Sequence, residues 1–159
     1  MNRRFSALLA LAFLLALASA GCGGKGAETG GGTAGVEETS PLDVGPRAGD
    51  APVAAALAAL GEPLFKAKGC TACHAYGKRL TGPDLKGVTR RRTHQWMEKQ
   101  ILHPEIMVKE DPIARKMMAE FNLQMANQGP TSDEAKSVIE YFKKLDEEAE
   151  AKGELTAQN

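Results

Sequence analysis

Apolar residues recur at helical spacing through the second half of the chain. The clearest run contains no Gly or Pro and comprises Ala135, Val138, Ile139, Phe142 and Leu145. Thr131 and Glu134 stand just before it as a capping box, in which both side chains accept backbone N–H groups of the first helical turn. The pattern therefore predicts a long final helix that starts beside Thr131.

Three shorter helices are predicted ahead of this one. Asp111–Pro112 is a capping residue followed by Pro at the first helical position. The apolar face of that helix comprises Ile113, Met117 and Phe121. Another helix covers residues 93–102 and is stopped by Pro104, and a third ends just before Cys70 with Pro63 near its start. The Ala-rich run 53–60 can add a turn or two to it. We find no alternating run long enough for a strand, so the predicted fold class is all-α.

The N-terminal residues 1–21 have the pattern of an export signal peptide. Arg3 and Arg4 supply the positive start, and residues 7–18 are an unbroken run of Ala, Leu and Phe. That run is too short to span a bilayer, which needs about 20 apolar residues. A cleaved signal is therefore expected, with a retained anchor as the alternative.

The rest of the chain divides by composition into three parts. Residues 22–51 are expected to be a flexible tether, because nine of the 28 residues from 23 to 50 are Gly and little apolar surface accompanies them. Residues 52–148 form one compact domain, small enough that a buried cofactor would supplement its core. Residues 149–159 are expected to be an acidic, disordered tail.

Three cysteines are an odd number for an exported chain. Cys70 and Cys73 belong to one motif, which leaves Cys22 at the end of the signal. Residues 19–22 resemble a bacterial lipobox, with Ser19 where Leu is usual. Lipidation of Cys22 would tether a bacterial, periplasmic protein to a membrane. Ordinary signal cleavage, which would leave Cys22 as a free thiol, is the alternative.

The charge of the chain is balanced overall but unevenly distributed. Twenty basic and twenty acidic side chains argue against a nucleic-acid partner. Residues 64–99 contain nine Lys or Arg, opposed only by Asp84 and Glu98. If this excess surrounds the functional site, it would steer an acidic docking surface of a partner protein toward it. An ordinary solvated surface is the alternative.

The motif Cys70-Thr-Ala-Cys73-His74 carries the chemistry. Two thiols three residues apart lie on one face of a helical turn and can add to the two vinyl groups of one porphyrin. The adjoining imidazole of His74 then lies over the iron, which is the haem attachment signature. A zinc site, a redox-active dithiol and a plain disulfide are alternatives. A zinc site would need a second pair of ligands, and a redox-active dithiol would need a βαβ context; the sequence has neither.

These residues resemble the class I cytochromes c over residues 61–145. The resemblance rests on Gly61, Leu64, Phe65 and Gly69 before the motif, on Gly82-Pro83-Asp84-Leu85 after it, and on Tyr141-Phe142 near the end. It implies about four short helices wrapped around one covalently bound haem c. It also implies that the first and last helices cross closely at Gly61.

The resemblance implies further residues at the haem. The backbone carbonyl of Pro83 would accept the second ring N–H of His74 and fix the imidazole. Met125, in a segment without helical pattern before the last helix, would be the sixth ligand, although Ala126 stands where Pro often follows it. The other candidates for the sixth position are His94, His103, Met107 and Met118. Trp96 would either donate its indole N–H to a haem propionate or pack between helices.

The implied function is single-electron transfer by a protein that is not an enzyme and has no small-molecule substrate. A His/Met-ligated haem would carry electrons in a respiratory chain, from a membrane electron donor to a terminal reductase or oxidase. One alternative is a haem-based small-ligand sensor or an enzyme with an open sixth site. The other is a fixed haem subunit of a larger oxidoreductase complex.

Overall fold

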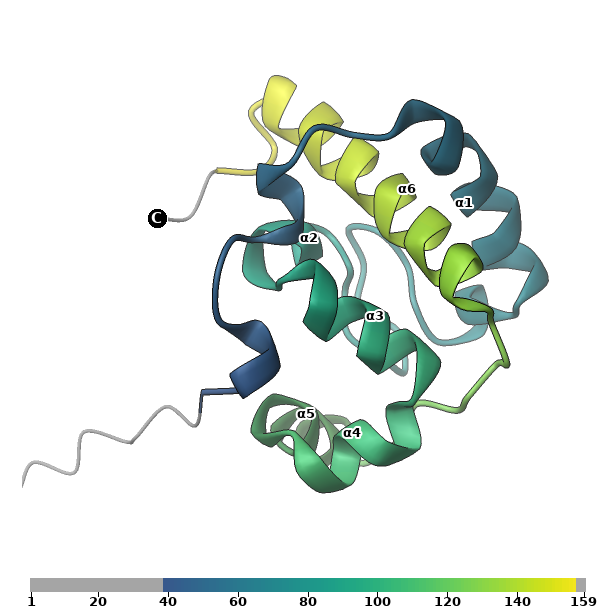
Figure 1. Ribbon diagram of the computed structural model, residues 1–159, viewed down its shortest axis with the longest axis vertical. Coiled ribbons are helices and arrows are strands. Elements are labelled where there is room, and N and C mark those ends of the chain that lie inside the picture. Colours follow the sequence, from purple (N-terminus) through teal and green to yellow (C-terminus); the bar gives the residue numbers. More distant parts are fainter. Residues whose placement is uncertain (1–38, 157–159) are drawn as a thin grey trace, which may run out of the picture. The chain divides into compact units, whose positions relative to one another are not determined.

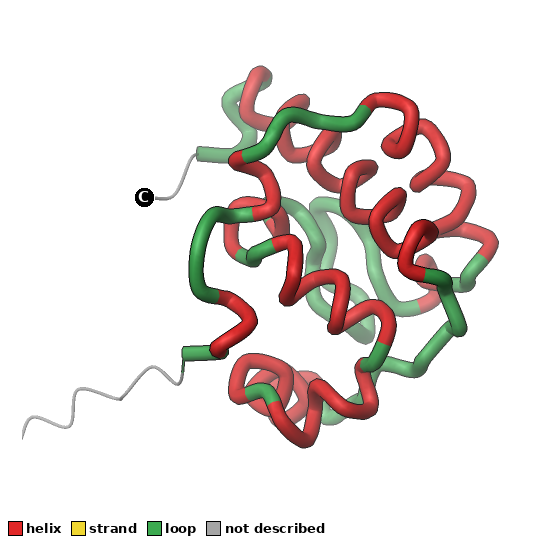
Figure 2. The backbone as a smooth tube through the Cα atoms, viewed as in Figure 1, coloured by secondary structure: helices red, strands yellow, loops and turns green. Residues whose placement is uncertain are grey.

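The fold comes from a computed structural model, which describes residues 39–156. Every regular element in this range is helical, as predicted (Figures 1 and 2). The α-helices are α1 (Ala55–Ala67), α2 (Val88–Arg91), α3 (His94–Leu102), α4 (Pro104–Glu110), α5 (Pro112–Phe121) and α6 (Ser132–Ala151). Three short 3₁₀ turns accompany them: η1 (Pro41–Asp43), η2 (Ala48–Asp50) and η3 (Cys70–Ala72). The export signal and Cys22 lie outside the described residues.

The predicted helix caps are present. Glu134 accepts the backbone N–H of Thr131 at 2.7 Å, and the Thr131 hydroxyl accepts that of Glu134 at 3.2 Å, which is a complete capping box for α6. Asp111 accepts the backbone N–H of Ala114 at 3.0 Å, with Pro112 at the first position of α5. The two clearest start signals in the sequence thus mark real helix starts.

Helix α1 and two short helices differ from the prediction. Helix α1 starts at Ala55, so the Ala-rich run belongs to one continuous helix and Pro63 lies inside it instead of near its start. Helix α2 is only four residues long, too short to leave a periodic pattern. Helix α4 begins with Pro104, which the prediction took only as the stop of the preceding helix. Pro is also favoured at the first position of a helix, so the same residue can end one helix and start the next.

Helices α1 and α6 cross closely, as Figure 1 shows. A Cβ atom at Gly61 would lie only 2.1 Å from the backbone oxygen of Ser137, so the crossing requires glycine there. Phe65, Val138 and Phe142 form a buried cluster beside it. The Phe65 and Phe142 rings meet edge to face with centroids 5.1 Å apart. The crossing expected at Gly61 is confirmed.

A second buried cluster is formed by residues of η2, α3, α4, α5 and α6. Its members are Ala48, Trp96, Met97, Met107, Ala114 and Ile139. Helix α6 contributes Val138 and Phe142 to one cluster and Ile139 to the other. It is therefore the element around which the domain packs.

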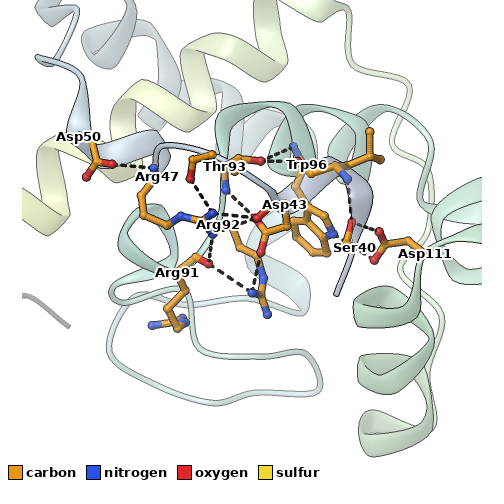
Figure 3. Close-up of polar contacts among 11 residues, drawn as sticks. Ser40, Asp43, Arg47, Asp50, Arg91, Arg92, Thr93, Trp96 and Asp111 are labelled. Carbon is orange, nitrogen blue, oxygen red and sulfur yellow. Dashed lines mark hydrogen bonds and ion pairs between the residues drawn. The ribbon is translucent and has the colours of Figure 1, made fainter. Parts of the chain in front are cut away.

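Residues 40–51, which we call the strap, pack against the domain instead of extending the tether. Asp43 accepts the backbone N–H of Thr93 at 2.7 Å and pairs with Arg92 at 3.0 Å (Figure 3). The backbone N–H of Ala48 donates to the Arg92 carbonyl at 2.8 Å, and the Ala48 side chain is buried. The tether predicted for residues 22–51 is therefore wrong for the strap. The Gly and Pro content of the strap suggested a flexible segment, although its side chains bond to residues far away in the sequence.

The C-terminal boundary also moves outward. Helix α6 continues to Ala151, beyond the predicted domain end at residue 148. Glu150 pairs with Arg90 at 2.7 Å, and Glu154 pairs with Lys86 at 3.1 Å. The predicted disorder of the tail is therefore wrong for residues 149–156, because its acids find basic partners on the domain.

Candidate functional site

One cavity of about 650 Å³ brings the predicted site residues together. Its volume is in the range of small-molecule and cofactor sites, and its wall is mainly apolar. The predicted residues that line it are Cys70, Cys73, His74, Pro83, Trp96 and Met125. All six side chains of the site proposed from the sequence thus surround the same space.

The attachment motif is a single tight turn. Gly69 enters it in the left-handed conformation (φ 71°), which allows helix α1 to end and the chain to turn toward the cavity. The carbonyl of Cys70 accepts the backbone N–H groups of Cys73 at 3.2 Å and His74 at 3.0 Å. The two thiols are not joined in a disulfide, and burial raises the pKa of the Cys70 thiol.

The His74 ring is held by the segment that follows it. Its Nδ1 lies 3.1 Å from the carbonyl oxygen of Pro83, which is the contact the resemblance implied. Gly82 makes this possible, because a Cβ there would lie 2.7 Å from Cε1 of the ring. Gly82 also donates its backbone N–H to the Cys73 carbonyl at 2.9 Å. With Nδ1 occupied as a donor, Nε2 is the nitrogen left for a metal.

Asp146 anchors the same segment from helix α6. Its carboxylate is fully buried and accepts four hydrogen bonds: from the Tyr76 hydroxyl at 2.8 Å, the Gly87 N–H at 2.7 Å, the Thr89 N–H at 3.1 Å and the Thr89 hydroxyl at 2.6 Å. Burial and the bond to Asp146 raise the pKa of the Tyr76 phenol, which therefore remains a donor. In the sequence this residue is one of several acids near the C-terminus, and nothing singled it out.

Met125 lies in residues 123–130, which we call the methionine loop. Its sulfur accepts a hydrogen bond from Nε2 of Gln100 at 3.7 Å. The Gln100 amide oxygen is buried beside the cavity without a partner among the described residues. Sequence reasoning missed Gln100, whose only signal is its place one helical turn after Trp96.

The competing candidates for a sixth ligand are placed less favourably. His94 lies 3.8 Å from Glu98 and His103 3.8 Å from Glu105, and neither lines the cavity. Met107 is 1% exposed in the second buried cluster and is also absent from the cavity wall. Met118 does line the cavity, so it is the remaining alternative to Met125 among the candidates considered.

Trp96 contacts the cavity through its ring but has its N–H occupied. The indole Nε1 donates to Asp111 at 3.0 Å within the buried cluster. The same carboxylate caps α5. It also accepts a hydrogen bond from the Ser40 hydroxyl of the strap (Figure 3). Of the two roles that the sequence left open for Trp96, packing between helices is the one found, with the indole N–H donated to Asp111 and not free for a propionate.

The basic excess of residues 64–99 is largely neutralised. Seven of its nine basic side chains have an acidic partner within 4 Å: Lys66–Glu62, Lys68–Glu134, Arg79–Glu120, Lys86–Glu154, Arg90–Glu150, Arg92–Asp43 and Lys99–Glu110. Four basic and three acidic side chains line the cavity: Lys68, Arg79, Arg91 and Arg92 against Asp84, Glu120 and Glu134. The structure therefore lacks the strong local positive charge that the sequence suggested.

The donor set fits a covalently attached haem. Two unpaired thiols, an imidazole with one nitrogen free and a thioether line one apolar cavity. These are the groups that attach and ligate a porphyrin iron in c-type cytochromes. Among the described residues, no hydrogen bond or ion pair occupies the other ring nitrogen of His74.

Comparison with known proteins agrees with this site. The family model for cytochrome c matches residues 58–146, more than half of the chain, so the chain belongs to the cytochrome c family and its cofactor is covalently attached haem c. It is a class I c-type cytochrome by fold. The family as a whole transfers electrons through haem.

Individual relatives match over different lengths. Cytochrome c-551 of Azotobacter vinelandii is 51% identical over 35 residues, which are 22% of this chain and 43% of that protein, so the match spans less than half of the relative. Cytochrome c from Rhodothermus marinus is 32% identical with a TM-score of 0.59, over 61% of this chain and 83% of that one. The cytochrome c domain of the pp3183 protein from Pseudomonas putida is 27% identical with a TM-score of 0.51, over 60% and 98%.

Proposed function

We propose that this protein is a single-electron carrier in a respiratory chain, with Cys70 and Cys73 holding the haem and His74 and Met125 ligating its iron. The observation that carries the proposal is that the imidazole bonded to Pro83 and the thioether bonded to Gln100 line one cavity beside both thiols. When bound, the haem supplies an iron that changes oxidation state by one electron.

The chain's own residues would set how that iron behaves. The Pro83 carbonyl orients the imidazole and raises its basicity. The Met125 thioether favours reduced iron relative to a second imidazole and closes the sixth position to other ligands. Gln100 and the second buried cluster, to which Trp96 belongs, support the wall around that position. A filled coordination sphere suits electron transfer better than turnover, which supports a carrier over an enzyme or a sensor.

The partners follow from this role and from the charges at the cavity. A membrane electron donor and a terminal reductase or oxidase are the partner classes we propose. The cavity wall has four basic and three acidic side chains, an excess of only one basic side chain. Attraction to an acidic docking surface is therefore expected to be modest, with a correspondingly modest dependence of the association rate on salt.

Export and anchoring rest on the sequence alone. We propose that residues 1–21 are removed as a signal peptide, that Cys22 is lipidated, and that residues from Cys22 to the start of the strap are the tether. This would make the protein a bacterial, periplasmic lipoprotein. In residues 39–156 no helix has the length and apolar character needed to cross a bilayer.

The proposal is tested by the spectrum and ligand binding of the purified holoprotein. We expect a low-spin, six-coordinate iron in both oxidation states and slow, incomplete binding of carbon monoxide to the reduced form, because Met125 occupies the sixth position. High-spin iron with rapid carbon monoxide binding would instead support a sensor or an enzyme with an open site. Stable co-purification with other redox subunits would favour a fixed subunit over a free carrier.

A further inference from the structure

Arg79 joins two segments of the cavity wall that are far apart in sequence. It follows the attachment motif, and its guanidinium lies 2.8 Å from a carboxylate oxygen of Glu120 at the end of α5. The same guanidinium stacks over the Phe121 ring, 4.1 Å from the centroid. Arg79, Glu120 and Phe121 all line the cavity. One side chain thus connects the His74 segment to the residues that precede Met125.

The methionine loop has one short-range hydrogen bond of its own, from the backbone N–H of Gly129 to the Asn127 side-chain oxygen at 2.8 Å. No backbone–backbone hydrogen bond joins residues 123–130 to one another or to the rest of the described chain. At its C-terminal end the loop is fixed by the Asn127 amide, which donates to the Leu102 carbonyl at 3.0 Å, and weakly by Lys68 at 3.5 Å from the Gly129 carbonyl. The position of Met125 must therefore depend on how firmly both ends of the loop are held.

The N-terminal end of the methionine loop depends on helix α5. Asn122 ends that helix in the left-handed conformation (φ 49°, ψ 33°), which is uncommon for a residue other than Gly. Glu120 and Phe121, which Arg79 contacts, immediately precede it. Holding the last turn of α5 therefore fixes the direction in which the chain enters the loop.

We propose that Arg79 is a positioning residue for the sixth ligand: by holding Glu120 and Phe121 it keeps the methionine loop closed and Met125 on the iron. This inference rests on the proposed ligation by Met125. Arg79 forms an ion pair with Glu120 and a cation–π contact with Phe121. The side chains of Arg79 and Glu120 are 58% and 50% exposed. Interactions of this exposure and geometry change an equilibrium by roughly three- to tenfold.

A matched control lies on helix α1. Lys66 pairs with Glu62 at 2.6 Å, with side chains that are 64% and 51% exposed, so the pair resembles Arg79–Glu120 in distance and exposure. Neither Lys66 nor Glu62 lines the cavity. Removing this pair measures the loss of a surface ion pair without any effect on the methionine loop.

The experiment measures binding of imidazole to the oxidised holoprotein, which requires the sixth ligand to leave first. In Arg79→Ala we expect imidazole to bind about three- to tenfold more tightly than in the wild type. Arg79→Lys should show a smaller increase, because it keeps the charge but loses the planar stacking surface. Lys66→Ala should bind imidazole as the wild type does. Unfolding by denaturant, measured in parallel, should show similar small losses in Arg79→Ala and Lys66→Ala.

Two results separate this inference from the proposed function. If Met125→Ala abolishes the Met–iron absorption band while Arg79→Ala and Lys66→Ala bind imidazole equally well, Met125 is the ligand and the positioning role of Arg79 is wrong. If Met125→Ala retains the band, the ligation by Met125 and the role of Arg79 fail together.

Discussion

Replacing Met125 by alanine is expected to remove the weak long-wavelength Met–iron band from the spectrum of the oxidised protein and to lower its reduction potential. Alanine offers no donor atom, so the iron loses the soft ligand that favours its reduced state. We expect a decrease on the order of 0.1 V, within the ~0.8 V range that axial ligands cover in haem proteins. Absorption spectroscopy and a redox titration measure the two effects.

Met118→Ala is the control for this substitution. Met118 also lines the cavity and is 40% exposed on helix α5. Its removal should leave both the band and the potential close to the wild type. A band that survives in Met125→Ala but disappears in Met118→Ala would move the sixth ligand to α5.

The second large effect is expected from Asp146→Asn. Each oxygen of the carboxylate accepts two hydrogen bonds, from Tyr76 and Gly87 on one and from Thr89 twice on the other. In the asparagine variant the NH₂ group faces a backbone N–H in either orientation of the side-chain amide, that of Gly87 or that of Thr89. Two donors then face each other, and that buried backbone N–H loses its acceptor. The free energy of unfolding should fall by about 2–4 kcal/mol, because a hydrogen bond to a charged acceptor contributes about 1.5–3 kcal/mol and a buried donor left without a partner costs about 1–3 kcal/mol.

Denaturant unfolding of the holoprotein tests this value, with Glu147→Gln as the control. Glu147 is the neighbouring acid on α6 but is exposed, so its change should alter stability by less than about 0.5 kcal/mol. Equal stability of the two variants would show that Asp146 does not organise the segment between His74 and α2. The Asp146→Asn variant should also bind imidazole more readily, since that segment carries Arg79 and Pro83.

The sequence predicted the features whose partners are close along the chain. The attachment motif spans five residues, and the caps at Asp111 and Thr131 act on the turn that follows them, so each is visible in a short window. The crossing of α1 and α6 was predictable for a different reason. Gly61 and Phe65 match a known family, and the constraint on Gly61 is the 2.1 Å approach of Ser137.

The residues that the sequence did not indicate act over long separations. Gln100 contacts Met125 across 25 positions, and Arg79 contacts Glu120 across 41. Asp146 bonds to Thr89 across 57 positions. Such contacts depend on how the helices pack, and a polar residue in an amphipathic helix gives no sign of which distant group it will meet.

The strap was mispredicted because composition averages over unlike residues. Gly and Pro near residues 45–49 suggested a continuation of the tether, yet Ser40 and Asp43 bond to Asp111 and Thr93. Charge was misjudged in a related way. Counting residues within a window gave a basic segment, whereas the acids that neutralise most of it come from elsewhere in the chain.

The proposed electron-carrier function depends most directly on haem being bonded to the two sulfurs of the attachment turn. Mass spectrometry of proteolytic fragments of the native protein measures this on the peptide that contains Cys70, Cys73 and His74. We predict one haem added to that peptide, with no free thiol remaining on it. A peptide of unmodified mass, or one with its two cysteines joined to each other, would contradict the account.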